Sequence, residues 1–470
     1  MTEHTLFKTT YDRKACDIGV VHIGYGAFHR AHQAVCIDDV MDMTGDLRWG
    51  IASVNLRQSE SQTFSIAAGA GEGYIVNTIA PDGARDFRLV RPHIMFADAT
   101  TAPEEATDLL ARDSVHMVTV TVTESGYYLN EHGQLDLDAP PVASGLAGKP
   151  SETVYAYLAA GLEKRLAASG RPLTILCCDN MRSNGHILRQ AMHTYLAACN
   201  KPDLADWVKA NVTFPCSMVD RITPRSTPGL QAEITALFPG HDISPVHAET
   251  FLQWVIEDNF AGPMPDLAQA GVEIVKNVEP FEEAKIRILN GGHTGLAYLG
   301  ALAGHQTFDQ AMRDPDLSTH FDRFEEQEVL PGLGDTVPFD TAHYLAQVAQ
   351  RFENQGIADN LERICMDGYS KMAIYVKPTL EACLQKGIIP QACFDSVASW
   401  IIYARKSHNG ECTIPYHEPY WDVLAPQIEP GREEQIASDP QIWGDLPQRF
   451  ECFVPSLVAA IQRMDQKWQA

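Results

Sequence analysis

Long hydrophobic runs are missing from this sequence. No stretch reaches the roughly 18 consecutive apolar residues that a membrane-spanning helix needs. The first twenty residues, MTEHTLFKTTYDRKACDIGV, contain no apolar segment of the kind found in a signal peptide. We therefore expect a cytoplasmic protein that has no membrane partner.

Positive charge is also scarce. Lysine and arginine number 36 against 61 aspartate and glutamate residues, which gives a formal net charge of −25 at pH 7. A protein of this charge repels nucleic acids and anionic membranes at long range, so we expect no nucleic-acid partner. A small anionic ligand is still compatible with the charge, because a local group of arginines can bind it inside an acidic protein.

Motifs typical of metal sites, disulfide frameworks and several hydrolases are absent. The eleven cysteines form no CxxC pair, which indicates reduced and mostly buried thiols. His29 and His32 lie three residues apart, but no third ligand is spaced to complete a coordination shell, so no metal site is predicted. The sequence also lacks a GxSxG elbow and a P-loop, which argues against serine hydrolases and NTPases.

The sequence has the length and composition of a folded protein with more than one domain. It contains 470 residues, of which 45% are hydrophobic and 21% charged. Single hydrophobic cores stop growing at roughly 250–300 residues, so at least two domains are expected. Gly and Pro are present in ordinary proportion, which excludes a fibrous or disordered chain.

The first part of the chain alternates short apolar runs with longer helical patterns. This alternation is typical of βαβ units around a largely parallel sheet, and fully apolar strands indicate a sheet that is covered on both faces. A helix is expected over 28–43. The expected strands cover residues 17–24, 48–55, 116–124, 173–179 and 212–220.

The pattern changes after Glu282. Strand-like runs nearly vanish, and helical periodicity dominates to the end of the chain. We therefore predict an α/β domain over residues 1–282 and a mostly α-helical domain over residues 283–470. The helical segments are expected at 284–304, 317–330, 341–353, 370–386, 391–405 and 455–467.

A candidate dinucleotide-binding turn, GYGAFH (24–29), follows the first apolar strand. Gly24 permits a tight turn, and Gly26 allows the backbone to approach a pyrophosphate at the start of a helix. His29 stands where the GxGxxG pattern has its third glycine. A bare GxG at a strand end is also a common structural turn, so this motif leaves both interpretations open.

The second strand ends without the acidic residue that usually binds the ribose of NAD. The sequence there is SVNLRQSE, in which Asn55 is able to bond a ribose hydroxyl and Arg57 a 2′-phosphate. The cofactor therefore stays open between NAD and NADP. A solvated surface role for Arg57 is an equal alternative.

The densest group of functional side chains is KIRILNGGH (285–293). At 100° per residue, Asn290 lies about 140° and His293 about 80° round the helix from Lys285, so the three fit within one face. A lysine on an apolar helix is costly to bury charged, which suits it to accept a proton near neutral pH. From the residues alone, a lysine at a helix start and a structural histidine remain the simpler interpretation.

Two more polar stretches follow apolar strands, at the edge where open α/β sheets bind ligands. CCDNMRSNG (177–185) carries Asn180, and SMVDRITP (217–224) carries Asp220 beside Arg221. Turn-forming asparagines and a structural Asp-Arg pair are the alternatives for these residues.

Taken together, these motifs resemble the mannitol dehydrogenase family of polyol-specific long-chain dehydrogenases. The resemblance covers nearly the whole chain and rests on HIGYGAFHRAHQ, TVTESGYY, CCDNMRSNG, FPCSMVDRITP, KIRILNGGH and RICMDGYSK. It implies a Rossmann-type, largely parallel α/β domain followed by a mostly α-helical domain. It also implies a nicotinamide cofactor and catalysis without zinc.

The resemblance assigns roles to individual residues. Lys285 is the general base, Asn180 and Asn290 form the oxyanion hole, and His293 binds and orients the substrate. Asp220 lies near the nicotinamide and the substrate, and the substrate pocket is lined by two cations, Arg363 and Lys371. The implied cofactor-binding residues are Gly24, Gly26, Phe28, Asn55, Arg57, Thr123 and Asp220.

The substrate is expected to be a small polyol or ketose of the mannitol–fructose type. Arg182 stands inside the first of the two polar stretches and Arg225 just after the second, and arginines suit carboxylates, although surface arginines on loops are an equal alternative. Reduction of a hexuronate such as fructuronate or tagaturonate is therefore the alternative, with a sugar acid as the substrate. NAD is the expected cofactor and NADP stays open.

Two further classes remain in view. One is a protein that keeps the fold and has lost the reaction, against which the presence of Lys285, Asn290 and His293 argues. The other is a zinc-dependent alcohol dehydrogenase. The sequence predicts no oligomeric state.

Overall fold

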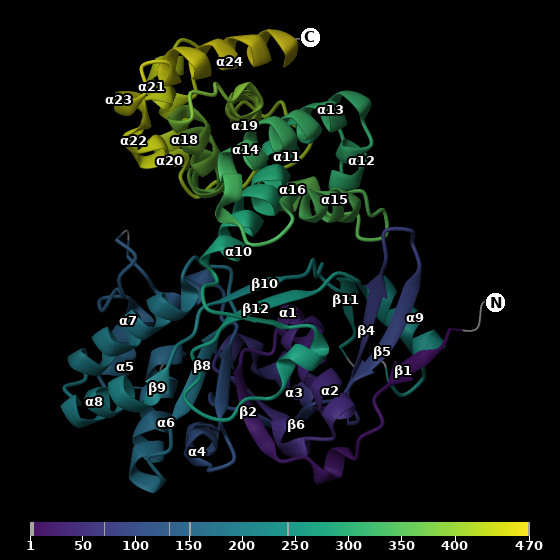
Figure 1. Ribbon diagram of the computed structural model, residues 1–470, viewed down its shortest axis with the longest axis vertical. Coiled ribbons are helices and arrows are strands. Elements are labelled where there is room, and N and C mark those ends of the chain that lie inside the picture. Colours follow the sequence, from purple (N-terminus) through teal and green to yellow (C-terminus); the bar gives the residue numbers. More distant parts are fainter. Residues whose placement is uncertain (1–3, 70, 131, 150–151, 242–243, 469–470) are drawn as a thin grey trace. The chain divides into compact units, whose positions relative to one another are not determined.

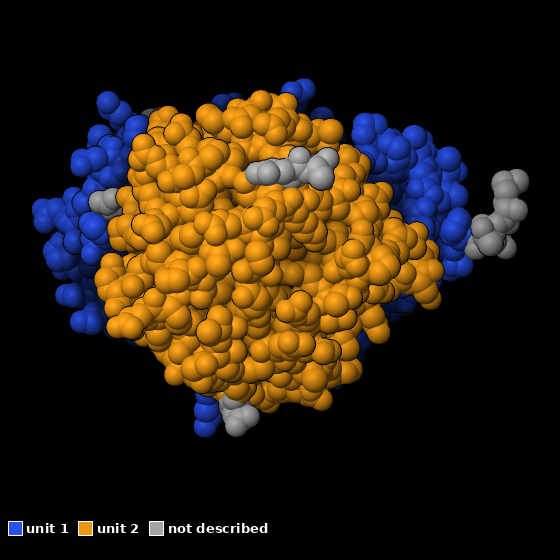
Figure 2. Space-filling view, turned by 90° about the horizontal axis from the view of Figure 1, so that it is seen from above, with its two compact units in different colours: residues 1–80, 84–279 blue, residues 81–83, 280–470 orange. Residues whose placement is uncertain are grey.

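The computed structural model describes residues 4–69, 71–130, 132–149, 152–241 and 244–468. It contains two compact units, shown in separate colours in Figure 2. Unit 1 comprises residues 1–80 and 84–279, and unit 2 comprises residues 81–83 and 280–470. The boundary predicted after residue 282 stays a prediction.

Unit 1 is built around a six-stranded sheet in which every strand runs parallel to its neighbours (Figure 1). The strand order is β6-β3-β2-β7-β8-β9, which numbered within the sheet is the 3-2-1-4-5-6 order of dinucleotide-binding folds. The strands are β2 (Ile18–Ile23), β3 (Gly50–Asn55), β6 (His93–Asp98), β7 (Met117–Val120), β8 (Leu173–Cys177) and β9 (Val212–Thr213). The predicted Rossmann-type domain is confirmed.

Apolar side chains leave both faces of this sheet. Val21 belongs to a core on one face, with α6 and α7, and Val20 to a second core on the other face, with α2. All residues of β2, β3, β7 and β8 are buried. The helices are α1 (Ala27–Ala31), α2 (Gln33–Thr44), α3 (Ser61–Ala68), α4 (Pro103–Asp108), α5 (Pro140–Leu146), α6 (Val154–Ala168), α7 (Asn184–Ala198), α8 (Pro202–Asn211) and α9 (Pro228–Leu237).

Two predicted strands and one predicted helix of unit 1 are wrong in detail. The strand expected over 116–124 is shorter, because β7 ends at Val120 and a 3-10 turn follows over 124–127. The run 212–220 is two strands, because Pro215 has no backbone N–H to donate and the chain leaves the parallel sheet between β9 and β10 (Ser217–Asp220). The helix expected over 28–43 is interrupted at His32 (φ −120°, ψ −91°), whose Nε2 lies 2.9 Å from the Gln253 carbonyl oxygen.

Two smaller sheets complete unit 1. β10 pairs antiparallel with β12 (Gln253–Glu257), which pairs parallel with β13 (Glu273–Val275). The four-stranded sheet has the order β1-β5-β4-β11. Its strands are β1 (Leu6–Lys8), β4 (Tyr74–Ile79), β5 (Arg85–Val90) and β11 (Val246–Glu249).

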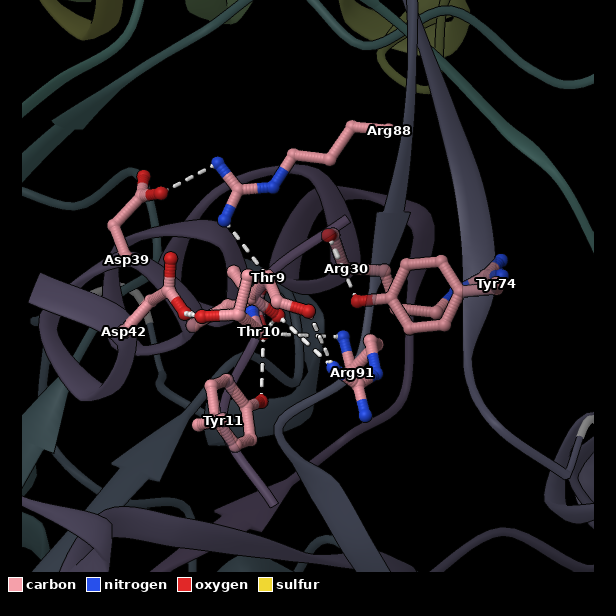
Figure 3. A network of polar contacts seen from close by, with 10 residues as sticks. Thr9, Thr10, Tyr11, Arg30, Asp39, Asp42, Tyr74, Arg88 and Arg91 are labelled. Carbon is pink, nitrogen blue, oxygen red and sulfur yellow. Dashed lines mark hydrogen bonds and ion pairs between the residues drawn. The ribbon is translucent and has the colours of Figure 1, made fainter. Parts of the chain in front are cut away.

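A polar network fixes α1 and α2 to this four-stranded sheet, as Figure 3 shows. Arg88 of β5 forms an ion pair of 2.7 Å with Asp39 of α2. The hydroxyl of Tyr74, on β4, donates to the carbonyl oxygen of Arg30 near the end of α1 at 2.8 Å. The C-terminal end of α1, the helix that follows the nucleotide turn, is therefore held in place by this sheet.

Unit 2 is helical, as predicted. Apart from an isolated bridge between Thr307 and Asn360, its described residues form no strand. The helices are α10 (Glu279–Ala284), α11 (Gly292–Leu302), α12 (Phe308–Met312), α13 (Pro315–Phe324), α14 (Leu330–Leu333), α15 (Thr341–Phe352), α16 (Leu361–Cys365), α17 (Gly368–Lys371), α18 (Lys377–Gln385), α19 (Gln391–His408), α20 (Trp421–Leu424), α21 (Glu433–Ala437), α22 (Pro440–Trp443), α23 (Leu446–Arg449) and α24 (Phe453–Trp468). Across the described parts of both units, no helix is long and apolar enough to cross a bilayer.

Three π-helical turns interrupt the helices of unit 2. They cover Lys285–Gly291 between α10 and α11, Glu325–Val329 between α13 and α14, and Met372–Val376 between α17 and α18. Such turns are rare and frequently mark functional sites. Glycines let them pack closely: a Cβ on Gly291 would lie 3.1 Å from the Tyr375 carbonyl oxygen, and one on Gly292 would clash with the Glu325 carboxyl group.

Candidate functional site

The glycine-rich turn after β2 has the backbone that a dinucleotide site needs. Gly24 has φ +96°, and a Cβ there would clash with the backbone oxygen of Thr121, so only glycine fits. A Cβ added to Gly26 would meet no atom within 4 Å. The backbone at Gly26 therefore borders open space at the start of α1, where a ligand can approach it.

His29 occupies the third glycine position of the pattern and is fully buried. Its ring stacks on His22 with the centroids 3.2 Å apart, and its Nε2 lies 2.9 Å from Nε2 of His93. Burial is the main cause that lowers the pKa of each of the three histidines well below 6.5, so they are neutral at physiological pH. The histidine that replaces the third glycine of GxGxxG is therefore part of a buried cluster of three neutral imidazole rings.

A pocket of about 130 Å³ lies at the switch point between β2 and β7. Five residues predicted to bind the cofactor line it, namely Gly24, Gly26, Asn55, Arg57 and Thr123. The other two are not among its lining residues: Phe28 stacks on His32 with the ring centroids 5.0 Å apart, and Asp220 ends β10.

The pocket end near β3 is more acidic than the sequence indicated. Arg57 donates to the Val122 carbonyl oxygen at 3.1 Å and lies 3.6 Å from the Glu60 carboxylate. Glu60 and Glu152 both line the pocket. Two carboxylates beside one arginine that already has partners disfavour a 2′-phosphate and suit ribose hydroxyls.

Asn55 holds the chain that carries Arg57. Its side-chain Nδ2 donates to the Asp98 carboxylate at 3.1 Å and to the Arg57 carbonyl oxygen at 3.0 Å, while its Oδ1 accepts the Arg57 N–H. Asn55 is also 4% exposed. Its contacts give it a positioning role, and its predicted bond to a ribose stays a prediction.

Asp179 organises the loop that contains Thr123. Its carboxylate accepts the N–H groups of Val122 and Thr123, each at 3.0 Å, and the Tyr127 hydroxyl at 2.6 Å. Burial raises the pKa of Asp179 to about 6. Thr123 itself has φ +66°, a strained backbone for threonine, so the loop depends on this carboxylate.

The other predicted residues of unit 1 lie at strand ends. Asn180 follows Asp179 and is exposed, whereas Asp220 is 4% exposed at the end of β10. Arg221 donates to the backbone oxygens of Glu249 and Ala31, which confirms the structural interpretation for that arginine. Arg182 and Arg225, the basis of the sugar-acid alternative, are both exposed.

Lys285 and Asn290 lie on one π-helical turn, and both are partly buried. The assumption of 100° per residue was therefore wrong over 285–291, since this segment is not an α-helix. A π-helix pairs residue i with residue i+5 on the next turn. Lys285 and Asn290 have that spacing, so they lie closer on one face than the predicted 140° allowed.

His293 lies on the first turn of α11 in a largely apolar pocket. Its ring stacks on Phe352 at 5.0 Å and meets the edge of Phe308 at 4.3 Å between centroids. Its Nε2 is 3.9 Å from a carboxylate oxygen of Asp359, which Arg363 binds through two nitrogens. Burial lowers the pKa of His293 to about 3, although Asp359 acts in the opposite direction.

Lys371 completes the predicted set in unit 2. Its Nζ donates to the Ile364 carbonyl oxygen at 2.8 Å, which places it at the end of α16, the helix that carries Arg363. Burial lowers its pKa from 10.5, partly offset by nearby carboxylates. Unit 2 therefore links His293, Asp359 and Arg363, with Lys371 beside the same helix.

Sequence reasoning gave no role to Asp359 and none to the Asp179 carboxylate as a loop anchor. Asp359 is far from His293 along the chain and belongs to none of the motifs above, so no spacing indicated the contact between these two residues. The spacing of Asp359 and Arg363 at i and i+4 was the one available hint.

Two family profiles match this sequence. The Mannitol dehydrogenase Rossmann domain matches residues 18–269, and the Mannitol dehydrogenase C-terminal domain matches residues 277–465. A D-arabinitol 4-dehydrogenase of Klebsiella pneumoniae is 36% identical over 446 residues, which are 94% of this chain and 97% of that protein. A mannitol 2-dehydrogenase of Cereibacter sphaeroides is 34% identical and covers 94% of this chain and 92% of its own.

Two solved structures are similar along almost the whole chain. A D-sorbitol dehydrogenase in substrate-free form has a TM-score of 0.90 at 29% identity and covers 98% of this chain and 96% of its own. The ternary complex of Pseudomonas fluorescens mannitol 2-dehydrogenase with NAD and D-mannitol has a TM-score of 0.83 at 31% identity. The match covers 98% of this chain and 94% of that chain.

Proposed function

This chain belongs to the mannitol dehydrogenase family, and we propose that it is an NAD-dependent dehydrogenase that interconverts a sugar alcohol and the corresponding ketose. The relatives named for mannitol and D-arabinitol support a polyol substrate, and the solved complex with NAD and D-mannitol supports NAD. Lys285, Asn290 and His293, the group on which the chemistry depends, are all present in this chain.

The observation that carries the proposal is the π-helical turn Lys285–Gly291. It brings an amine and an amide five residues apart to successive turns of one helix face, and His293 follows on the next element. A partly buried amine beside an amide N–H donor is what oxidation of an alcohol requires: one group takes the proton and the other stabilises the oxygen.

In the proposed reaction the residues of this chain handle the proton and the charge. The neutral Nζ of Lys285 accepts the hydroxyl proton, while the amide N–H group of Asn290 donates to the oxygen as it becomes negative. The part that the family resemblance gives to Asn180 in the same step stays a prediction. NAD, when bound, supplies the acceptor for the hydride that leaves the same carbon. In the reverse direction the protonated Lys285 returns the proton to the oxygen of the ketose.

His293 and the cations orient the substrate. Because its pKa is about 3, His293 is a neutral ring that donates one hydrogen bond and accepts one, which suits a hydroxyl group. Asp359 holds Arg363 in place through two nitrogens. Arg363 and Lys371 supply further N–H donors for the remaining hydroxyls, and the substrate contact that the family resemblance gives to Asp220 stays a prediction.

The residues of unit 1 fit NAD. Gly24 and Gly26 leave the backbone open to a pyrophosphate, as a Cβ at Gly26 would meet nothing within 4 Å. The carboxylates of Glu60 and Glu152 in the pocket near Arg57 match ribose hydroxyls and repel a 2′-phosphate. Thr123, anchored by Asp179, lines the same pocket.

Steady-state kinetics of the purified full chain tests this function. D-mannitol, D-sorbitol and D-arabinitol are assayed with NAD⁺ and with NADP⁺, and D-fructuronate and D-fructose with NADH. We expect turnover of at least one polyol, with kcat/KM at least tenfold higher for NAD⁺ than for NADP⁺. Reduction of D-fructuronate without turnover of any polyol or of D-fructose would contradict the proposal.

A further inference from the structure

Unit 1 also contains a group of three side chains that are able to bind a metal ion, and none of them belongs to the nucleotide or substrate residues described above. It consists of His186 on α7, Cys216 just before β10, and Glu257 at the end of β12. One ligand atom from each residue lies within 4.8 Å of the other two. We propose that these three residues form a zinc-binding site that stabilises unit 1 and takes no part in the chemistry of the reaction.

Hydrogen bonds hold the backbone around the three residues in place without a bound ion. The Glu257 N–H donates to the Cys216 carbonyl oxygen at 3.0 Å, and the Cys216 N–H donates to Oε2 of Glu257 at 3.0 Å. Asn184, two residues before His186, bonds both the N–H and the carbonyl oxygen of Ser217, at 3.0 and 2.8 Å. Three elements distant in sequence are thus joined at the positions that carry the ligands.

Close packing between the start of α7 and the segment before β10 also restricts the backbone that carries the three ligands. A Cβ on Gly185 would clash with the backbone oxygens of Phe214 and Pro215, so the start of α7 lies directly against the segment that leads to Cys216. Cys216 is 7% exposed, whereas His186 is exposed. The exposed imidazole is the member of the group that has room to turn towards an ion, and the proposal needs the three ligand atoms to come closer together than the 4.8 Å within which they now lie.

The donor set selects zinc among common cations. Thiolate and imidazole ligands suit Zn²⁺, whereas Mg²⁺ and Ca²⁺ prefer oxygen ligands alone. Zinc binds sulfur at roughly 2.3 Å and nitrogen or oxygen at roughly 2.0–2.2 Å, so tetrahedral ligands lie roughly 3.3–3.7 Å apart. The Cys216 N–H bonded to Oε2 orients the carboxylate, and a water molecule completes the fourth position.

Binding has a defined proton balance. The Cys216 thiol releases one proton to solvent when its sulfur becomes a zinc ligand, so the affinity for zinc falls as the pH falls. An ion at this place would fix α7 to β10 and β12 (Figure 1). Unit 1 would then unfold at a higher temperature in the presence of zinc.

Zinc titration of the full chain, first treated with a chelator, tests the site. Free zinc is followed with a chromophoric chelator, and thermal unfolding and alkylation of Cys216 by iodoacetamide are followed in parallel. We expect one zinc ion per chain, a rise of several degrees in melting temperature and protection of Cys216. His186→Ala and Cys216→Ser should each weaken binding by at least tenfold.

Matched controls come from the same region. His193 lies further along α7 and Cys199 follows the end of that helix; neither belongs to the group. His193→Ala and Cys199→Ser should bind zinc like the parent chain. Because His186 is exposed, His186→Ala should fold normally, and its melting temperature without zinc checks this. No zinc binding by the parent chain, equal binding by His186→Ala, or Mg²⁺ binding in its place would overturn the proposal.

Discussion

At the scale of single residues, the two glycines of the nucleotide turn have different physical roles. Gly24 is required by the backbone, because its φ is +96° and a Cβ would clash with Thr121. Gly26 is required only by the ligand, because a Cβ there meets open space. A substitution of Gly24 is therefore expected to affect folding, whereas a substitution of Gly26 is expected to affect cofactor binding alone.

Gly26→Ala should leave the melting temperature of the ligand-free protein within about 1 °C of the parent, because nothing contacts the added methyl group. Its Kd for NADH should rise at least tenfold, since the methyl group takes up space that the pyrophosphate needs. Fluorescence titration with NADH measures the Kd. Gly24→Ala is the contrasting variant and should lower stability even without cofactor; equal effects of the two substitutions would refute this division.

His293 should make folding depend on pH. Its folded pKa is about 3, below the usual value of 6.5, so between these values the unfolded chain binds more protons. The resulting stability is complete above pH 6.5 and is lost as the pH falls from 6.5 towards 3. Between pH 7 and pH 5, the free energy of unfolding measured with urea should fall by about 2 kcal/mol more for the parent than for His293→Gln. An identical loss in both proteins would show that His293 is not buried as a neutral ring.

At the scale of elements, the start of α11, directly after the π-helical turn Lys285–Gly291, packs against the π-helical turn Glu325–Val329. The carboxyl group of Glu325 is fully buried against Gly292, and neither of its oxygens has a hydrogen-bond partner among the described residues. Burial raises the pKa of Glu325 well above 4.5, with Arg287 opposing, so the group is favoured as a neutral acid.

Glu325→Gln should therefore stabilise the protein increasingly as the pH rises. The folded pKa of Glu325 exceeds the unfolded value, so the parent loses stability with rising pH above about 4.5, by up to about 1.4 kcal/mol per pH unit until the folded pKa is reached. The uncharged glutamine does not titrate and removes this slope.

Urea unfolding of the parent and Glu325→Gln from pH 5 to pH 8 measures the slope. Glu326→Gln is the control, because Glu326 is the next residue and is exposed. A Glu325→Gln curve that runs parallel to that of the parent would contradict the buried neutral acid.

These elements show what sequence reasoning could reach. The apolar runs 17–24, 48–55 and 173–179 correspond to β2, β3 and β8, because buried parallel strands carry a continuous signal. β4 and β5 mix polar and apolar residues, and no strand was predicted there. The π-helical turns keep a helical composition, so composition and periodicity predicted helices there and missed the extra residue in the turn.

The site followed the same rule. Lys285, Asn290 and His293 stand close together in the sequence, so their spacing made them one candidate group, whereas their catalytic roles come from the family resemblance and stay predictions. The contact of Asp359 with His293 and the contacts of Glu152 and of the Cys216 group depend on the fold, and no spacing along the chain predicts them.

At the scale of the whole molecule, the net charge of −25 is the dominant property. Like charges repel one another in the compact state more than in the expanded chain, and salt screens that repulsion over roughly 10 Å at 0.1 M. Surface ion pairs are weakened by the same salt, so the two effects oppose one another, and we expect the repulsion among an excess of 25 negative charges to be the larger because exposed pairs contribute little.

The melting temperature should therefore rise by a few degrees as NaCl increases from about 0.01 to about 0.3 M. Differential scanning fluorimetry at constant, near-neutral pH measures the change. Potassium chloride should act like sodium chloride, because screening depends on ionic strength. A fall in melting temperature over this range would mean that attractive pairs dominate the electrostatics.

The central claim is that Lys285 removes the hydroxyl proton of a polyol. The kcat of Lys285→Ala with NAD⁺ and the preferred polyol tests it most directly. Lys276→Ala, an exposed lysine of unit 1, is the control, and NADH titration checks that cofactor binding is intact. We predict a loss in kcat of about 10²–10⁴-fold for Lys285→Ala, an unchanged Kd for NADH and normal turnover for Lys276→Ala. Turnover by Lys285→Ala close to that of the parent would contradict the account.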